Sequence, residues 1–176
     1  MSHKNPLLIS NYIKDEDGDA ANLFDFIRHL DKCECKYSLE DLTQLFEYVI
    51  SPSDRKFTGA VYTPKHIRER IIDEITRGLS PTILSNKTFA DISCGCGGFF
   101  LTIAQLIHTS SGKKYSQIFH ENIFGVDLQE YSIQRTKLLL SLLALLDGED
   151  VVIEFNLYEG NSLSFDFSII APFDFS

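Results

Sequence analysis

Apolar residues recur at helical spacing through residues 21–80, and this periodicity predicts helices. A first helix would bury one face made of Leu23, Phe24, Ile27 and Leu30. Ser38 and Asp41 resemble a capping box, which predicts the start of a second helix. The stripe of that helix is Leu42, Leu45, Phe46 and Val49.

A third helix is predicted after Tyr62, with Thr63 as its N-cap and Pro64 as its first helical residue. Its end is expected at Gly78. Its apolar stripe is Ile67, Ile71, Ile72 and Ile75. Residues 1–80 are therefore expected to form an N-terminal helical segment.

From residue 81 to 176 the pattern changes to short apolar runs that alternate with longer helical ones. Strands are predicted at 88–92, 122–127 and 151–157, and helices at 99–108 and 131–146. The polar stretch 109–117 is expected to be a surface insertion. Alternation of strand and helix is typical of an α/β fold with a Rossmann-like parallel sheet.

Composition narrows the class of protein. Apolar residues make up 44% of the 176 residues, which excludes a mainly disordered chain. A formal charge of −9 argues against a domain that binds nucleic acid over its whole surface, because such surfaces are usually basic. Contact with DNA would therefore need a local patch or a partner. The sequence contains no apolar run of about 20 residues and no signal-peptide pattern. We therefore expect a cytoplasmic protein with reduced cysteines and no membrane contact.

The stretch from Asp91 to Phe99 carries the chemistry: a strand ends in a carboxylate, glycines turn the chain, and a helix begins. Gly95 and Gly97 allow a positive φ and a close approach of the backbone to a ligand. The N-terminus of the helix offers N–H groups to an anion. Ligands of open parallel sheets bind at the carboxyl ends of the strands, so the turn predicts a small-molecule site.

Two phosphate-binding turns fit poorly. A P-loop requires Lys after the last glycine, and here Gly98 is followed by Phe99. The dinucleotide fingerprint requires a third glycine where Phe100 stands. A second carboxylate, Asp127, ends the next strand, in the usual position for ribose hydroxyls. A structural glycine turn, and a helix N-cap role for Asp127, remain as alternatives.

Four elements, in order, resemble the class I S-adenosylmethionine (SAM)-dependent DNA adenine-N6 methyltransferases of type I and type IIG restriction–modification systems. Tyr62-Thr63-Pro64 resembles the family's Tyr-Thr-Pro motif, and Asp91 to Phe99 resembles its Asp-Pro-Ala-Cys-Gly-Ser-Gly-Gly-Phe turn. Gly125-Val126-Asp127 resembles its ribose-binding strand, and Gly160-Asn161-Ser162-Leu163 its Gly-Asp-Ser-Leu element. The resemblance covers about residues 55–176.

The resemblance implies a SAM-binding, Rossmann-like domain over residues 81–176. It places Tyr62, Thr63 and Asp91 around the methionine part of SAM, Asp127 at the ribose and Asn161 near the adenine. The full set of cofactor-binding residues that it implies is Tyr62, Thr63, Pro64, Asp91, Ser93, Gly95, Gly97, Phe99, Asp127, Leu128, Asn161 and Ser162. Asn161 replaces the family's acid, but its carbonyl oxygen can still accept a hydrogen bond from adenine.

The family's catalytic Asn-Pro-Pro-Tyr/Phe motif is absent from the sequence, so no catalytic residue is assigned. We expect a truncated sheet and a chain that is inactive alone, with DNA reached through missing regions or through restriction and specificity subunits. The alternation Phe165, Phe167, Phe173 and Phe175 predicts an uncovered apolar face and self-association. A non-catalytic interaction or regulatory module, or methylation of another substrate, is the alternative.

Other clusters favour ordinary structural roles. Cys33-Glu34-Cys35 and Cys94-Gly95-Cys96 lack the two-residue gap that zinc sites favour, so no metal site is assigned. The histidines are scattered. Residues 55–77 carry a local net charge of +3, counting six bases (55, 56, 65, 68, 70, 77) against three acids (69, 73, 74). This stretch could touch phosphates, but a solvated helix is the simpler interpretation.

Overall fold

The computed structural model describes residues 25, 28–29, 32, 37–49 and 62–167. Its elements run in the order α3 (Leu39–Tyr48), α5 (Lys65–Thr76), α6 (Pro81–Leu84), β1 (Phe89–Asp91), α7 (Gly98–Ser111), α8 (Tyr115–Glu121), β2 (Ile123–Asp127), α9 (Glu130–Leu146) and β3 (Asn156–Glu159). The predicted stripe Leu23, Phe24, Ile27 and Leu30 lies outside the described residues, as do Cys33, Cys35, Phe173 and Phe175.

The three strands form a parallel sheet in the order β1-β2-β3. Asp91 pairs with Gly125, and Asp127 pairs with Glu159, so the ends of β1 and β2 meet at one edge. The predicted α/β fold with a parallel, Rossmann-like sheet is confirmed in the described part of the chain. The division into domains at residue 80 stays a prediction.

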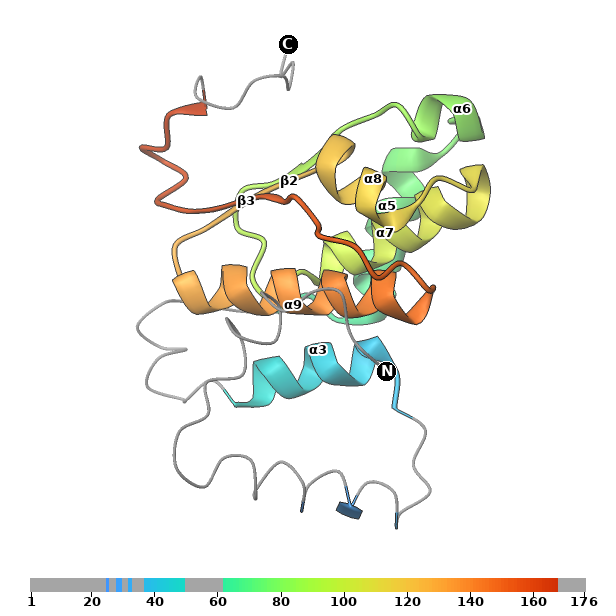
Figure 1. Ribbon diagram of the computed structural model, residues 1–176. Coiled ribbons are helices and arrows are strands. Elements are labelled where there is room, and N and C mark those ends of the chain that lie inside the picture. The colour runs from blue at the N-terminus through green and yellow to red at the C-terminus, as the bar shows by residue number, and fades with distance from the viewer. Residues whose placement is uncertain (1–24, 26–27, 30–31, 33–36, 50–61, 168–176) are drawn as a thin grey trace.

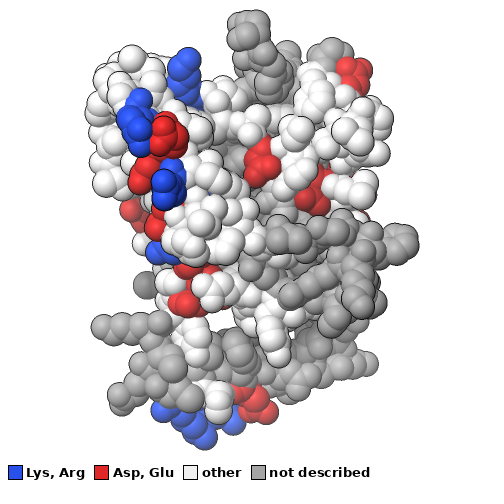
Figure 2. All heavy atoms as spheres, turned by 180° about the vertical axis from the view of Figure 1, so that it is seen from behind, with Lys and Arg blue, Asp and Glu red and all other residues white. Residues whose placement is uncertain are grey.

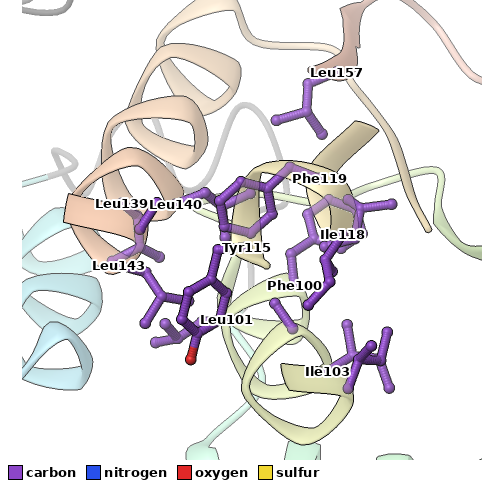
Figure 3. Packing of buried hydrophobic residues seen from close by; sticks show 14 of the residues in the cluster. Phe100, Leu101, Ile103, Tyr115, Ile118, Phe119, Leu139, Leu140, Leu143 and Leu157 are labelled. Carbon is purple, nitrogen blue, oxygen red and sulfur yellow. The ribbon is translucent and has the colours of Figure 1, made fainter. Parts of the chain in front are cut away.

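The main core lies between one face of the sheet and helices α7, α8 and α9. Figure 3 shows rings and aliphatic side chains from the three helices converging on one another. Phe100 of α7, Phe119 of α8 and Leu140 of α9 are at most 2% exposed. Gly125 on β2 leaves room for this packing, because a Cβ there would stand 2.7 Å from both Phe100 and Leu157. The backbone of β2 therefore lies directly against the Phe100 ring.

The opposite face of the sheet carries a smaller aromatic cluster. Phe124 and Val126 of β2 are fully buried, and Tyr158, Phe165 and Phe167 pack against them. The ring centroids of Phe165 and Phe167 lie 5.2 Å apart in an edge-to-face arrangement. Two of the four phenylalanines that were expected to be uncovered thus cover this face themselves.

Helix α3 begins with the predicted capping box. The Ser38 hydroxyl accepts from the Asp41 N–H (3.2 Å), and the Asp41 carboxylate accepts from the Ser38 N–H (2.7 Å). Hydrogen bonds from the Ser38 side chain and backbone hold the pKa of Asp41 below its ordinary value. Leu42 and Phe46 pack against the core, whereas Leu45 is exposed, so the predicted stripe is only half right. Figure 1 shows α3 alongside α9.

The predicted stripe of α5 is wrong at three of its four positions. Ile72 is buried, but Ile67, Ile71 and Ile75 face solvent. The position next to Ile67 that turns inward is Arg68, which is 3% exposed and paired with an acid of α3. The helix itself begins at Lys65, one residue later than predicted, and Pro64 precedes it without a side-chain cap from Thr63. It ends at Thr76, two residues before Gly78.

The predicted surface insertion at 109–117 is only partly right, because most of its residues are exposed but two helices extend into it. Helix α7 continues to Ser111, and α8 begins at Tyr115, whose ring is buried. Glu149 caps α8, because its carboxylate accepts the Tyr115 N–H (2.6 Å) and the Ser116 N–H (3.0 Å). Burial opposes ionisation of Glu149, but the hydrogen bonds from Ser116 and Tyr115 outweigh it and lower its pKa.

Strand β3 lies later in the chain than the predicted 151–157. Pairing with β2 starts at Phe124, which faces Asn156. Residues 151–155 therefore precede the strand and do not pair with β2, although Ile153 and Phe155 still pack on the core. Among the helices that the structure describes, none is long and apolar enough to cross a membrane.

Candidate functional site

The glycine turn after β1 is held in place from several sides. Gly95 and Gly97 have φ of +53° and +79°, a region that L side chains rarely adopt. The Cys94 N–H donates to the Val126 carbonyl (3.1 Å), which ties the turn to β2. The Thr136 hydroxyl of α9 donates to the Gly95 carbonyl (2.9 Å). The turn is thus fixed by neighbours from two other elements before any ligand is considered.

Asp127 joins this turn to the loop after β2. Its Oδ2 accepts the Gly95 N–H (2.9 Å), and its Oδ1 accepts the Gln129 N–H (2.9 Å). Each carboxylate oxygen can accept a second hydrogen bond, so the side chain is oriented and still able to bind a ligand hydroxyl. The predicted N-cap alternative is not what the structure shows, because α9 begins only at Glu130, after Gln129 in the cap position.

Asp91 stands at the neighbouring strand end. Its Oδ1 accepts the Ser93 N–H (3.0 Å). Asp91 pairs in register with Gly125, two residues before Asp127, so both carboxylates lie on one face of the sheet. Burial raises the pKa of Asp91, the Ser93 N–H opposes that shift, and the negative charge of Asp127 adds to it.

Burial holds the Tyr62 phenol and the Cys94 thiol, both beside the turn, in their neutral forms. Burial, together with the hydrogen bond from Cys96, raises the pKa of Tyr62. The Cys96 thiol lies 3.5 Å from the Tyr62 hydroxyl oxygen. Burial and then the charges of Asp127 and Asp91 raise the pKa of Cys94. Thiolate chemistry at Cys94 is therefore disfavoured. No cluster of three or more metal-ligating side chains occurs among the residues described.

Arg68 lies buried beside the turn and binds groups from three elements. Its Nη2 lies 2.6 Å from the Glu40 carboxylate of α3. Its Nη1 donates to the Thr63 carbonyl (3.2 Å), and its Nε donates to the Thr102 hydroxyl of α7 (3.4 Å). A Cβ on Gly98 would stand 2.9 Å from its Nη1, so the guanidinium lies directly against the first residue of α7.

A cavity of about 480 Å³ opens at this edge of the sheet, a size typical of small-molecule sites. Ten of the twelve predicted site residues line it: Tyr62, Thr63, Asp91, Ser93, Gly95, Phe99, Asp127, Leu128, Asn161 and Ser162. Pro64 and Gly97 do not, and Gly97 is instead buried under Thr136. Sequence reasoning missed further lining residues, among them Thr43, Arg68, Gln129, Tyr131 and Ser132.

The segment after β3 forms the far wall of the cavity. The Asn161 Oδ1 accepts the Leu163 N–H (3.1 Å), so the oxygen expected to face a ligand closes a local turn. The Gly160 N–H donates to the Asp127 carbonyl (2.9 Å), which fixes this wall to the end of β2. Leu128 and Leu163 are 60% and 95% exposed and give the mouth of the cavity an apolar surface.

The cavity suits a ligand with a cation and hydroxyl groups better than one with phosphates. Its two carboxylates accept hydrogen bonds and attract positive charge. Among its described lining residues the one Lys or Arg side chain is Arg68, which is paired with Glu40. In the stretch 55–77, Lys65 and Arg77 also pair with acids of α5, Glu69 and Glu74. Among the described residues on the face in Figure 2, basic and acidic side chains intermingle.

Asp91→Asn is expected to stabilise the protein above the pKa of the wild-type carboxyl. Because burial raises the pKa of Asp91 above its ordinary value, there is a pH interval in which the folded state still holds a proton that the unfolded state has lost. The free energy of unfolding therefore falls as pH rises through the interval, and the amide avoids this loss. Urea unfolding of both proteins from pH 3 to pH 8 measures the difference. A variant that is less stable than wild type at neutral pH would contradict the expectation.

A comparison with known families gave one match over most of the chain. The family model for N-6 DNA methylases matches residues 38–174, from the first residue of the α3 capping box to beyond β3. A comparison with curated proteins gave no match. Because the family match covers well over half of the 176 residues, this chain belongs to the N-6 DNA methylase family, whose members use SAM to methylate adenine in DNA.

Proposed function

We propose that the chain is the SAM-binding portion of a site-specific DNA adenine-N6 methyltransferase from a restriction–modification system. We further propose that the cavity at the sheet edge is its cofactor site. The observation that carries the proposal is the pair Asp91 and Asp127, at neighbouring strand ends and facing one cavity across a glycine turn. SAM contains an ammonium, a carboxylate, a ribose diol and an adenine, and no phosphate. That chemistry fits a cavity with two carboxylates and a paired arginine.

Each part of the cofactor has a matching group in the cavity wall. Asp91 would hold the ammonium, and the N–H groups of the first turn of α7 would hold the carboxylate. Asp127 would accept the ribose hydroxyls, with its orientation set by Gly95 and Gln129. When bound, SAM supplies the electrophilic methyl group.

The remaining predicted groups complete the assignment. Tyr62, Thr63 and Ser93 would surround the methionine part, and Phe99 would add an apolar wall. Leu128 and Ser162 would contact the adenine. Because the Asn161 oxygen already accepts the Leu163 N–H, we propose that its amide donates to an adenine ring nitrogen. Pro64 would act by shaping the segment before α5.

We also propose that these 176 residues bind SAM without methylating DNA by themselves. The sequence holds no Asn-Pro-Pro-Tyr/Phe motif to grip the amino group of a flipped adenine. The DNA and the catalytic groups would come from further regions or from partner subunits. Association with restriction and specificity subunits would also supply positive surface for the phosphates of DNA.

Isothermal titration calorimetry with SAM tests the cofactor proposal, with ATP as the phosphate-bearing control. We expect one site for SAM and no heat from ATP. Folded protein that gives no heat with SAM would favour a non-catalytic interaction module instead. A parallel assay with radiolabelled SAM and mixed-sequence DNA should incorporate no label, and incorporated label would contradict the proposed lack of activity.

A further inference from the structure

A buried ion pair holds helix α3 against the wall of the cavity. Glu40, in the first turn of α3, meets Arg68 at 2.6 Å, and the side chains are 16% and 3% exposed. Removing two charges from water costs several kcal/mol for each ion. A pair at this depth requires further hydrogen bonds, and the guanidinium finds them at Thr63 and Thr102. The pair thus joins α3, the segment before α5, and α7.

Besides its pair with Glu40, the Arg68 guanidinium contacts two residues of the cavity wall, Thr63 and Gly98. Its Nη1 holds the carbonyl of Thr63, which lines the cavity. The same nitrogen lies against Gly98, the first residue of α7, and Gly98 and Phe99 both line the cavity. A planar fork with fixed donor directions can set two such positions at once, which a flexible ammonium cannot do.

Helix α3 is also held at its other end. Arg135 of α9 donates to the Phe46 carbonyl (3.1 Å), and its guanidinium lies over the Tyr131 ring at 4.9 Å. Tyr131 lines the cavity, as does Thr43 in the middle of α3. Helix α3 therefore contacts the cavity wall, or residues that hold that wall, at the start, the middle and the end of the helix.

We propose that Arg68 is a positioning residue for the SAM site, and that its pair with Glu40 makes the docking of α3 part of cofactor binding. This inference rests on the proposed function. Arg68 contacts no reacting atom: it acts by fixing the Thr63 carbonyl and the start of α7. The coupling is reciprocal: if the docking of α3 strengthens SAM binding, bound SAM must stabilise the docking of α3.

The first experiment compares SAM affinity by calorimetry in four proteins. Wild type is the reference. Arg68→Met with Glu40→Gln removes the guanidinium and leaves no unpaired buried charge. Arg68→Lys with native Glu40 keeps the charge and loses the fork. Ile107→Val, in the buried core of α7, is the control for a loss of stability away from the cavity.

We expect the double variant and Arg68→Lys each to bind SAM about tenfold more weakly. This is the effect expected when the displaced cavity wall loses one hydrogen bond to a charged group of the cofactor. Ile107→Val should keep its affinity within about twofold, because its change in packing does not reach the wall. A folded double variant that binds SAM as tightly as wild type overturns the inference. Wild type that binds no SAM at all instead overturns the proposed function.

Hydrogen exchange on the unaltered chain provides a second test that needs no variant. Saturating SAM should slow amide exchange in α3 (Leu39–Tyr48) and in the first turn of α5. Helix α8 contributes no residue to the cavity among the residues described, so its exchange should slow less than that of α3 and only by the general stabilisation that a bound ligand gives. Equal exchange in α3 with and without bound SAM overturns the inference.

Discussion

Gly97→Ala is expected to destabilise the fold by about 2–5 kcal/mol and to abolish measurable SAM binding. Two costs add. A left-handed backbone costs an L residue about 1–2 kcal/mol, and Gly97 has a φ of +79°. The new methyl would also stand 2.6 Å from the Thr136 Cγ2, and such overpacking costs about 1–3 kcal/mol. Displacement of Thr136 would break its hydrogen bond to the Gly95 carbonyl and so release the turn.

Two control variants separate these costs. Gly112 ends α7 with a φ of +71° and has nothing within 4 Å of its missing Cβ. Gly112→Ala should therefore cost only about 1–2 kcal/mol and leave SAM affinity unchanged. Thr136→Ser removes the clashing methyl but keeps the hydroxyl, so it should partly rescue Gly97→Ala. Urea unfolding and calorimetry measure both quantities, and equal losses in the Gly97 and Gly112 variants would show that the clash is unimportant.

Asp127→Asn is expected to weaken SAM binding about 100-fold and to destabilise the protein by about 1.5–3 kcal/mol. The carboxylate accepts two backbone N–H groups, from Gly95 and Gln129. An amide has one oxygen, so one of these donors would face the NH₂ group and lose its acceptor. Loss of one hydrogen bond to a charged group accounts for the expected decrease in the free energy of unfolding. Two weakened hydrogen bonds to the ribose diol would account for the expected loss of SAM affinity.

Asp147→Asn is the matched control for that change. Asp147 is a half-exposed carboxylate at the end of α9, outside the cavity lining, and its Oδ2 lies 3.7 Å from the His108 Nε2. An exposed pair of this kind contributes little to stability. Its variant should match wild type in both SAM affinity and unfolding. If Asp127→Asn kept wild-type affinity, the ribose assignment would be wrong, whatever the stability result.

The order of strands and helices could be predicted from the sequence because each element has a clear local signal. The runs that became β1, β2, α7 and α9 are strongly apolar and bounded by glycine or by charge. The same signals placed Asp91 and Asp127 at adjacent strand ends, since parallel strands end at one edge. The presence of two carboxylates at that edge could therefore be predicted from the order of the strands.

Other features depended on packing that no local pattern records. Arg68 of α5 turns inward in place of the predicted Ile67, because Glu40, 28 residues away, pairs with it. Helix α8 was hidden by its polar residues, although Tyr115, Ile118 and Phe119 have the helical spacing of a buried face. Strand β3 was predicted too early because its register comes from β2, a partner that its own sequence cannot show.

The central claim is that the cavity between Asp91 and Asp127 holds SAM. A crystal structure of this chain with S-adenosylhomocysteine, the stable product of the cofactor, tests it most directly. The account predicts ribose hydroxyls within hydrogen-bond distance of the Asp127 carboxylate and the amino group facing Asp91. A ligand seated at another place on the fold, with these two carboxylates uninvolved, would contradict it.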